Sequence, residues 1–278
     1  MIIGKSKKEL EKMRAAGRLA GLVREELRRM SRPGVTTLDL DRAAERMILE
    51  AGAKPTFKGY HGYPYSICAS VNEQVVHGFP SDYVLEDGDI ISIDVGATLD
   101  GFVGDTATTV PVGQVSEDKL RLIRVAEESL ERAIEQCRHG RHLGDIGWAV
   151  QEYAEEQGYS LVRDYGGHGI GRKMHEDPHI PNYGRPGTGT KIKNGYVFAV
   201  EPMLNMGTHH TKTLADGWTV VTVDGQPSAH VEHTIAITEE GPQVFTRVPE
   251  EIERLQLAGA AGAAGATPNA GGGVSGLA

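Results

Sequence analysis

The two halves of this 278-residue chain carry the same succession of elements, at an offset of about 106 residues. The segment KMRAAGRLAGLVREELRRMSRPG resembles KLRLIRVAEESLERAIEQCRHG, and both are typical of an amphipathic helix that ends in a basic turn closed by glycine. TTLDLDRAAERMILEAG corresponds in the same way to HLGDIGWAVQEYAEEQG, a second helix that also ends at glycine. The match lies in pattern and not in identity, and it indicates a duplicated structural unit.

A strand follows the helices in each half and carries a carboxylate at its end. LEDGDIISID aligns with IKNGYVFAVE, so that Asp94 and Glu201 occupy the same last position. Elements that run ααββ twice predict an α+β fold with helices on one side of a curved antiparallel sheet. We expect a single domain over residues 1–250, with halves at about 10–110 and 117–240, in which the two carboxylates converge near a pseudo-twofold axis.

Two aspartates lie on either side of a strong hairpin signal in IISIDVGATLDGFVGDTATTVPV. A two-residue turn at Asp100-Gly101 places Asp94 opposite Ala107 and makes Asp105 its diagonal neighbour, within about 8 Å on one face. Two carboxylates this close repel, so either one is protonated or cations lie between them. Cations are favoured when other ligands converge on the pair.

Further candidate ligands come from apolar, strand-like sequence in the second half. An ionised Glu201 at the end of FAVEPM needs a compensating charge, because burying it alone is costly. Glu232 in AHVEHTIAIT shares a strand face with Thr234 and is either a ligand or a solvated residue. The glycines around His168 permit close backbone approach, and no strand-turn-helix context supports a nucleotide loop there. The candidate metal ligands are Asp94, Asp105, His168, Glu201 and Glu232.

A carboxylate-rich set with one imidazole suits manganese, iron, cobalt or zinc better than thiolate-seeking metals. Divalent ions lower the pKa of a bound water from about 15.7 to about 7, so a two-metal hydrolase is expected. His77 in VVHGFP and His175 in KMHEDP are each followed by a breaker and are either structural or in contact with substrate. We assign both to substrate and transition-state contacts. The histidines expected to be structural or exposed are His61, His139, His142, His179, His209, His210, His230 and His233.

Composition limits which partners the chain can bind and in which compartment it is expected. The net charge of -9 gives no general attraction to nucleic acid. Basic residues between Lys5 and Arg32 interleave with acidic ones, which favours a solvated helix face over a weak docking surface. Cys68 and Cys137 lack disulfide or zinc-finger spacing, as expected for a reducing cytoplasm. No signal peptide and no run of 18 apolar residues is found, so we expect neither secretion nor a membrane span.

The C-terminal sequence changes character. From Ala258 it reads AGAAGATPNAGGGVSGLA, which offers almost nothing large to bury. We therefore expect residues 251–278 to form a flexible tail that is dispensable for the chemistry, with a partner-binding tail as the alternative.

The motifs resemble those of the type I methionine aminopeptidase family nearly to Val248. The resemblance is carried by GYHGYPYSICASVNEQVVHGFP, DGDIISIDVG, DGFVGDTATT, GGHGIGRKMHEDP, FAVEPM and DGWTVVTVDGQPSAHVEHTIAIT. It implies the pita-bread fold and removal of the initiator methionine from nascent chains whose second residue is small. It also implies a cytoplasmic monomer, with contact to the ribosome surface as a further possibility.

The same resemblance implies roles for individual residues. Asp105 and Glu232 would bridge two divalent ions, and Glu201 would also handle protons at the metal-bound water. His77 is expected near the scissile amide nitrogen, and His175 near the carbonyl, where it stabilises the oxyanion. The methionine pocket would be formed by Tyr60, Tyr63, Cys68, Met174 and Trp218, because soft and aromatic groups suit a thioether.

Some positions depart from the family pattern and leave the shape of the pocket open. Met174 stands where many members carry an aromatic residue, and Phe57 stands where a small residue or cysteine is common. The 31-residue spacing from Glu201 to Glu232 leaves no room for the insertion of type II relatives and indicates the short bacterial type. The alternatives are an Xaa-Pro aminopeptidase, a non-catalytic partner-binding protein on this fold, and a purely structural metal site.

Overall fold

The computed structural model describes residues 2–249 and 251–253, which divide into two units between Arg247 and Val248. The elements of the first half are α1 (Lys7–Met30), α2 (Thr37–Glu50), β1 (Lys54–Pro55), η1 (Tyr60–Gly62), β2 (Ile67–Val71), β3 (Gln74–Val76), β4 (Ile90–Leu99) and β5 (Phe102–Pro111). Those of the second half are α3 (Glu117–Gln136), α4 (Leu143–Glu156), β6 (Ser160–Leu161), β7 (Gly166–Gly169), β8 (Glu176–Pro181), β9 (Val197–Val200), β10 (Met203–Asn205), β11 (Thr211–Thr213), β12 (Val220–Thr222), β13 (Ser228–His230), β14 (His233–Thr238) and β15 (Gly241–Val244).

Capping boxes mark where α1 and α2 begin. Ser6 Oγ accepts a hydrogen bond from the Glu9 amide, and the Glu9 carboxylate accepts one from the Ser6 amide, so α1 begins at Lys7. Thr36 and Asp39 form the same capping box at the start of α2. The predicted basic turns lie beyond the helix ends, because α1 stops at Met30 and α3 at Gln136.

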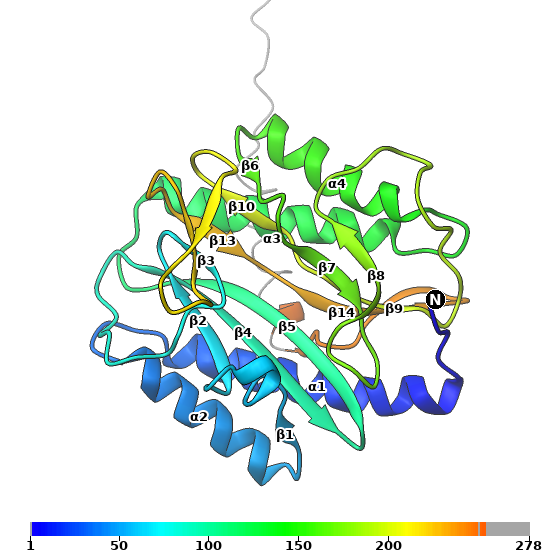
Figure 1. Cartoon of the computed structure of the whole chain (residues 1–278), viewed down its shortest axis with the longest axis horizontal. Coiled ribbons are helices and arrows are strands. Elements are labelled where there is room, and N and C mark those ends of the chain that lie inside the picture. Colours follow the sequence, from blue (N-terminus) through cyan, green and yellow to red (C-terminus); the bar gives the residue numbers. More distant parts are fainter. Residues whose placement is uncertain (1, 250, 254–278) are drawn as a thin grey trace, which may run out of the picture. The chain divides into compact units, whose positions relative to one another are not determined.

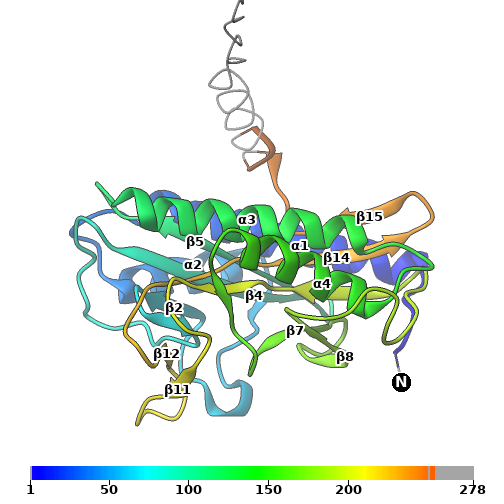
Figure 2. The same ribbon diagram turned by 90° about the horizontal axis from the view of Figure 1, so that it is seen from above.

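Each half builds its own hydrophobic core between a helix pair and its strands. In the first half, α1 and α2 pack on β2 and β4 through residues such as Leu27, Leu40 and Ile93. In the second half, α3 and α4 pack on β9 and β14 through residues such as Ile146 and Phe198. Figure 2 shows α1 and α3 on one side, with β2, β7 and β8 on the other. This arrangement confirms the predicted α+β fold class.

The β4–β5 hairpin has the predicted register. Asp94 pairs with Ala107, and the turn residues Asp100 and Gly101 both have positive φ angles, of 51° and 78°. β4 lies between β5 and β2, which fixes the aspartate-bearing strand inside its sheet (Figure 1). The two aspartates therefore point from neighbouring strands toward the same side.

The two halves are joined by a short bridge at the position of a predicted ligand. The Glu232 amide donates to the Ala107 carbonyl at 3.0 Å, and the Ala107 amide donates to the Glu232 carbonyl at 3.3 Å. Glu232 lies between β13, which pairs with β10, and β14, which pairs with β9. The backbone of Glu232 thus links β5 of the first half to the strands of the second half.

Part of the basic segment from Lys5 to Arg32 is buried, so the prediction of a solvated helix face is wrong for Arg24. Its side chain is only 2% exposed, and Nη1 donates to Thr106 Oγ1 at 2.6 Å. Thr106 Oγ1 in turn donates to the Glu232 carbonyl at 2.8 Å. The sequence shows charge but not which helix face packs on β5.

In the second unit, the amides of Glu251 and Ile252 donate to the Val248 carbonyl. The predicted flexible tail lies, apart from residues 251–253, outside the described residues. Among the described residues, no helix has the length and hydropathy needed to cross a membrane.

Candidate active site

Five carboxylate and imidazole side chains converge beside the bridge between the halves. Asp94 comes from β4, Asp105 from β5, His168 from β7, Glu201 directly follows β9, and Glu232 precedes β14. All five line one cavity of about 410 Å³. The structure therefore brings together every predicted metal ligand, although the five span 139 positions from Asp94 to Glu232.

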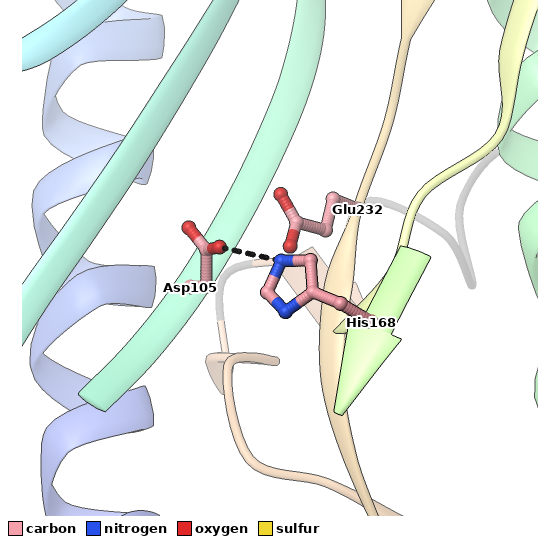
Figure 3. A group of neighbouring side chains, drawn as sticks. All are labelled: Asp105, His168 and Glu232. Carbon is pink, nitrogen blue, oxygen red and sulfur yellow. Dashed lines mark ion pairs between the residues drawn. The ribbon is translucent and has the colours of Figure 1, made fainter. Parts of the chain in front are cut away.

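Three of these groups are close enough to share one ion. The ligand atoms of Asp105, His168 and Glu232 lie within 4.8 Å of one another, and all three side chains are buried (Figure 3). His168 Nε2 lies 3.7 Å from Asp105 Oδ2 and 3.6 Å from Glu201 Oε1. Glu201 is therefore a fourth candidate ligand next to these three, in contact with His168.

The carboxyl groups that line the cavity lie close together and away from water. Burial raises the pKa values of Asp94, Asp105, Glu201 and Glu232, and repulsion among neighbouring carboxylates raises those of Asp105 and Glu232 further. Asp94 Oδ1, Asp105 Oδ1 and Glu232 Oε1 are buried without a hydrogen-bond partner in the described part of the chain. Unpaired buried oxygens of this kind are costly, and a divalent cation removes that cost.

His168 is held in the form that a metal ligand needs. Its Nδ1 lies 2.9 Å from the Gly169 carbonyl, which places the ring proton on Nδ1 and leaves the Nε2 lone pair free toward the carboxylates. Burial lowers the pKa of His168 to about 3, so the ring stays neutral. The donor set is therefore one imidazole nitrogen and carboxylate oxygens, which fits divalent transition metals.

Aromatic and sulfur-containing side chains form the other wall of the cavity. The residues predicted to bind methionine all line it, namely Tyr60, Tyr63, Cys68, Met174 and Trp218. The Tyr63 ring lies edge-on to Trp218 at 5.1 Å, and its hydroxyl donates to backbone carbonyls. The wall is therefore rigid and apolar beside the charged group.

Phe57, one of the two departures from the family pattern, also lines this wall. Its ring fills space that Gly96 of β4 leaves open, since a Cβ at that position would lie 2.7 Å from Phe57 Cε1. Met174, the other departure, is 6% exposed and contributes its thioether to the same wall. Both residues line the apolar part of the cavity.

The two histidines predicted to contact substrate lie at the boundary between the charged and apolar walls. The His175 ring centroid is 4.2 Å from that of His168, and Tyr60 Oη lies 2.8 Å from His175 Nδ1. His77 has a left-handed backbone conformation, with φ of 59°, which is uncommon for a residue with a side chain. Burial, together with the charges of nearby histidines, lowers the pKa of His77 to about 4.

Sequence reasoning missed two histidines of this site. His230, expected to be structural or exposed, is buried, and its Nε2 lies 3.6 Å from Glu201 Oε2. His61, assigned to the same group, lines the cavity beside Tyr60. Residues i and i+2 of a strand share a face, so the spacing from His230 to Glu232 was the available signal.

Comparisons with known proteins agree with this geometry. Residues 11–239 match the model of metallopeptidase family M24. Methionine aminopeptidase 1 of Bacillus subtilis is 54% identical over 248 residues, which cover 89% of this chain and all of the relative. The chain belongs to the methionine aminopeptidases of metallopeptidase family M24.

Solved structures of the family support the same assignment. The crystal structure of methionine aminopeptidase from Rickettsia prowazekii superposes with a TM-score of 0.87 at 46% identity, covering 89% of this chain and 100% of the other. An X-Pro aminopeptidase from Thermotoga maritima superposes with a TM-score of 0.71, at 24% identity and over 64% of its own length. That likeness shows a shared fold. As a member of metallopeptidase family M24, the chain depends on divalent metal. The buried side chains of Asp105, His168 and Glu232 fit such an ion.

Proposed function

We propose that the chain removes the N-terminal methionine from nascent proteins and peptides whose second residue is small. It would act as a two-metal hydrolase in the cytoplasm, as a monomer, through a catalytic domain of residues 1–250. One observation carries the proposal: the buried ligand group and a wall of thioether and aromatic side chains belong to the same cavity. A methionine bound against that wall brings its peptide bond next to the ligand group.

Five residues would hold the ions: Asp94, Asp105, His168, Glu201 and Glu232. When bound, divalent ions polarise the scissile carbonyl and lower the pKa of a coordinated water. The unpaired buried oxygens of Asp94, Asp105 and Glu232 support this assignment, because nothing else among the described residues compensates them.

The apolar wall would select methionine by its shape and softness. A thioether gains from contact with aromatic rings and is polarisable enough to fill an irregular gap. Tyr63 and Trp218 offer ring edges and faces, and Met174 and Cys68 offer sulfur. A branched or charged first side chain would lose these contacts or leave its charge unpaired.

Three residues would act on the reacting atoms. Glu201, whose pKa burial raises, is a stronger base than an exposed carboxylate, so it accepts the proton that the attacking water gives up. The Tyr60 hydroxyl donates a hydrogen bond to His175 Nδ1. The proton of the neutral His175 ring then lies on Nε2, where it can donate to the developing oxyanion. His77, neutral because of its lowered pKa, contacts the nitrogen of the scissile amide.

The proposal is tested with purified, metal-loaded protein and short peptides. We expect fast release of methionine from Met-Ala-Ser, and little release of the first residue when leucine or lysine replaces methionine. Efficient release of other residues without release of methionine would overturn the proposed function.

Two rivals are separated by the same assay. An Xaa-Pro aminopeptidase on this fold would cleave Ala-Pro peptides and spare Met-Ala-Ser. A non-catalytic partner-binding protein would show no metal-dependent turnover, and a catalyst loses its turnover on Asp105→Asn. The apolar wall beside the ligands favours the methionine substrate over both rivals.

A further inference from the structure

The segment between β7 and β8 carries two side chains of the cavity, Met174 and His175, but has no regular secondary structure of its own. Ile170 donates to the Val197 carbonyl and Gly171 accepts from the Val103 amide, but residues 172–175 lack the ladder of hydrogen bonds that would fix them in a helix or strand. A catalytic group must be held within about 0.5 Å of its working position, so this segment needs support from outside its own backbone.

The carboxylate of Glu176, the first residue of β8, supplies that support. Its Oε1 accepts hydrogen bonds from the amides of Arg172 at 2.8 Å and Lys173 at 3.2 Å. One carboxylate oxygen thus gathers two backbone donors from the turn just before Met174. Oε2 of the same group points the other way and is bound by a residue 171 positions earlier in the chain.

That residue is Lys5, in the extended segment before α1. Its ammonium donates to Glu176 Oε2 at 2.7 Å, and the two side chains are only 7% and 18% exposed. A second donor binds the Ile3 carbonyl at 3.1 Å, and the Lys5 amide is anchored on the Gly195 carbonyl at 2.7 Å. The pair therefore joins the segment before α1 to the first residue of β8.

Space for this contact is left by a glycine. A Cβ on Gly171 would lie 2.6 Å from Lys5 Cε and equally close to Glu176 Oε1. The backbone at Gly171 therefore packs directly on the ion pair. Shielding from water strengthens the attraction between the two charges, and loss of the ammonium would leave the carboxylate partly buried without its charge partner.

We propose that Lys5 is a positioning residue for the segment 170–175, and that it acts through the carboxylate of Glu176. Lys5 touches neither the cavity nor the metal ligands. It fixes Glu176, Glu176 fixes the amides of Arg172 and Lys173, and these hold Met174 and His175 in place. This inference rests on the proposed function for its kinetic consequence, whereas its structural part stands alone.

Hydrogen exchange tests the structural part without any substrate. In Lys5→Met, which keeps the length of the side chain and removes the charge, the amides of Arg172 and Lys173 should exchange about tenfold faster or more. Lys8→Met is the matched control, because Lys8 is an exposed lysine of the adjoining turn. Unchanged exchange at both amides in Lys5→Met would overturn the proposal.

Kinetics test the consequence for the reaction. For Lys5→Met we expect kcat/KM on Met-Ala-Ser to fall about tenfold, while the Mn²⁺ affinity measured by calorimetry stays unchanged. Lys5→Arg should recover part of the loss, since a guanidinium still donates to Glu176 Oε2. A parallel loss of metal affinity, or no recovery with arginine, would mean general damage and overturn the proposal.

Coupling between the two residues gives a third readout. Glu176→Gln keeps an oxygen for the two amides but removes the charge that Lys5 binds. If Lys5 acts through Glu176, the double variant Lys5→Met/Glu176→Gln should be no slower than the worse single variant. Multiplying defects would refute that route. If Lys5→Met does not fold, the same hydrogen-exchange and kinetic measurements on Lys5→Arg and Glu176→Gln test the proposal instead.

Should the unmodified chain release no methionine, the proposed function fails, and the exchange experiment still decides whether Lys5 holds the segment.

Discussion

Replacing Glu232 by glutamine should nearly abolish the stabilisation that metal gives the protein. Glu232 is 2% exposed, and its Oε1 has no hydrogen-bond partner among the described residues. Glutamine has the same shape but carries no charge and offers only one oxygen. The change therefore removes an ionic ligand at the bridge between the halves while leaving the packing intact.

The size of the effect follows from binding linkage. At a metal concentration about 100 times the Kd, the metal stabilises the folded protein by about 2.7 kcal/mol, or about 5–11 °C in Tm for a chain of this size. Changes around a ligand already cost about 10–100-fold in affinity, so loss of the ligand itself should cost at least about 100-fold. At the same concentration the variant would then gain only about 0.4 kcal/mol, or about 1–2 °C.

The effect of the substitution on the stability of the metal-free protein provides a second check. Glu232 lies among buried carboxylates that repel it, so metal-free Glu232→Gln should be at least as stable as the metal-free parent. Thermal unfolding with and without Mn²⁺ measures both quantities, and Glu239→Gln is the control, because Glu239 is exposed in the turn after β14. A variant that keeps more than half of the parent's metal-induced shift would refute the assignment of Glu232.

Three other perturbations probe the site and its frame. Metal affinity should rise from about pH 5.5 to about pH 7.5 in calorimetry, because burial raises the pKa of Asp94 to about 7 and protons compete with metal at the lower pH. A flat profile would contradict this. Tyr60→Phe should lower kcat/KM about threefold to tenfold at unchanged metal affinity, since His175 loses its partner on Nδ1. Gly104→Ala should lower the free energy of unfolding by about 1–3 kcal/mol in urea titration, because its Cβ would lie 2.5 Å from Gly17 Cα. A variant as stable as the parent would show that α1 moves away from β5 at little cost.

The hairpin was predictable because its cause is local. Asp100-Gly101 favours positive φ at both turn positions, and that turn alone sets Asp94 opposite Ala107. The equivalence of Asp94 and Glu201 was predictable for a similar reason, since each ends an apolar strand in a repeated unit. Both inferences needed only the order and spacing of residues.

The surroundings of His230 and Arg24 could not be predicted, because distant segments of the chain build them. Val231 and Glu232 interrupt the strand between β13 and β14, and the register there depends on the bridge to Ala107. Arg24 is buried only because β5 brings Thr106 under α1. Residue type alone predicts exposure for Arg24, and the packing of α1 on β5 buries it.

The sequence by itself determined the duplicated architecture, the hairpin register and the five candidate ligands, because periodicity, turn chemistry and the cost of burying charge act over short spans of chain. Only the tertiary structure decided that the ligands share a cavity with the apolar wall, that His230 faces Glu201, and that Lys5 binds the Glu176 carboxylate. These contacts join residues far apart in the chain, and their distances depend on how the two halves pack together.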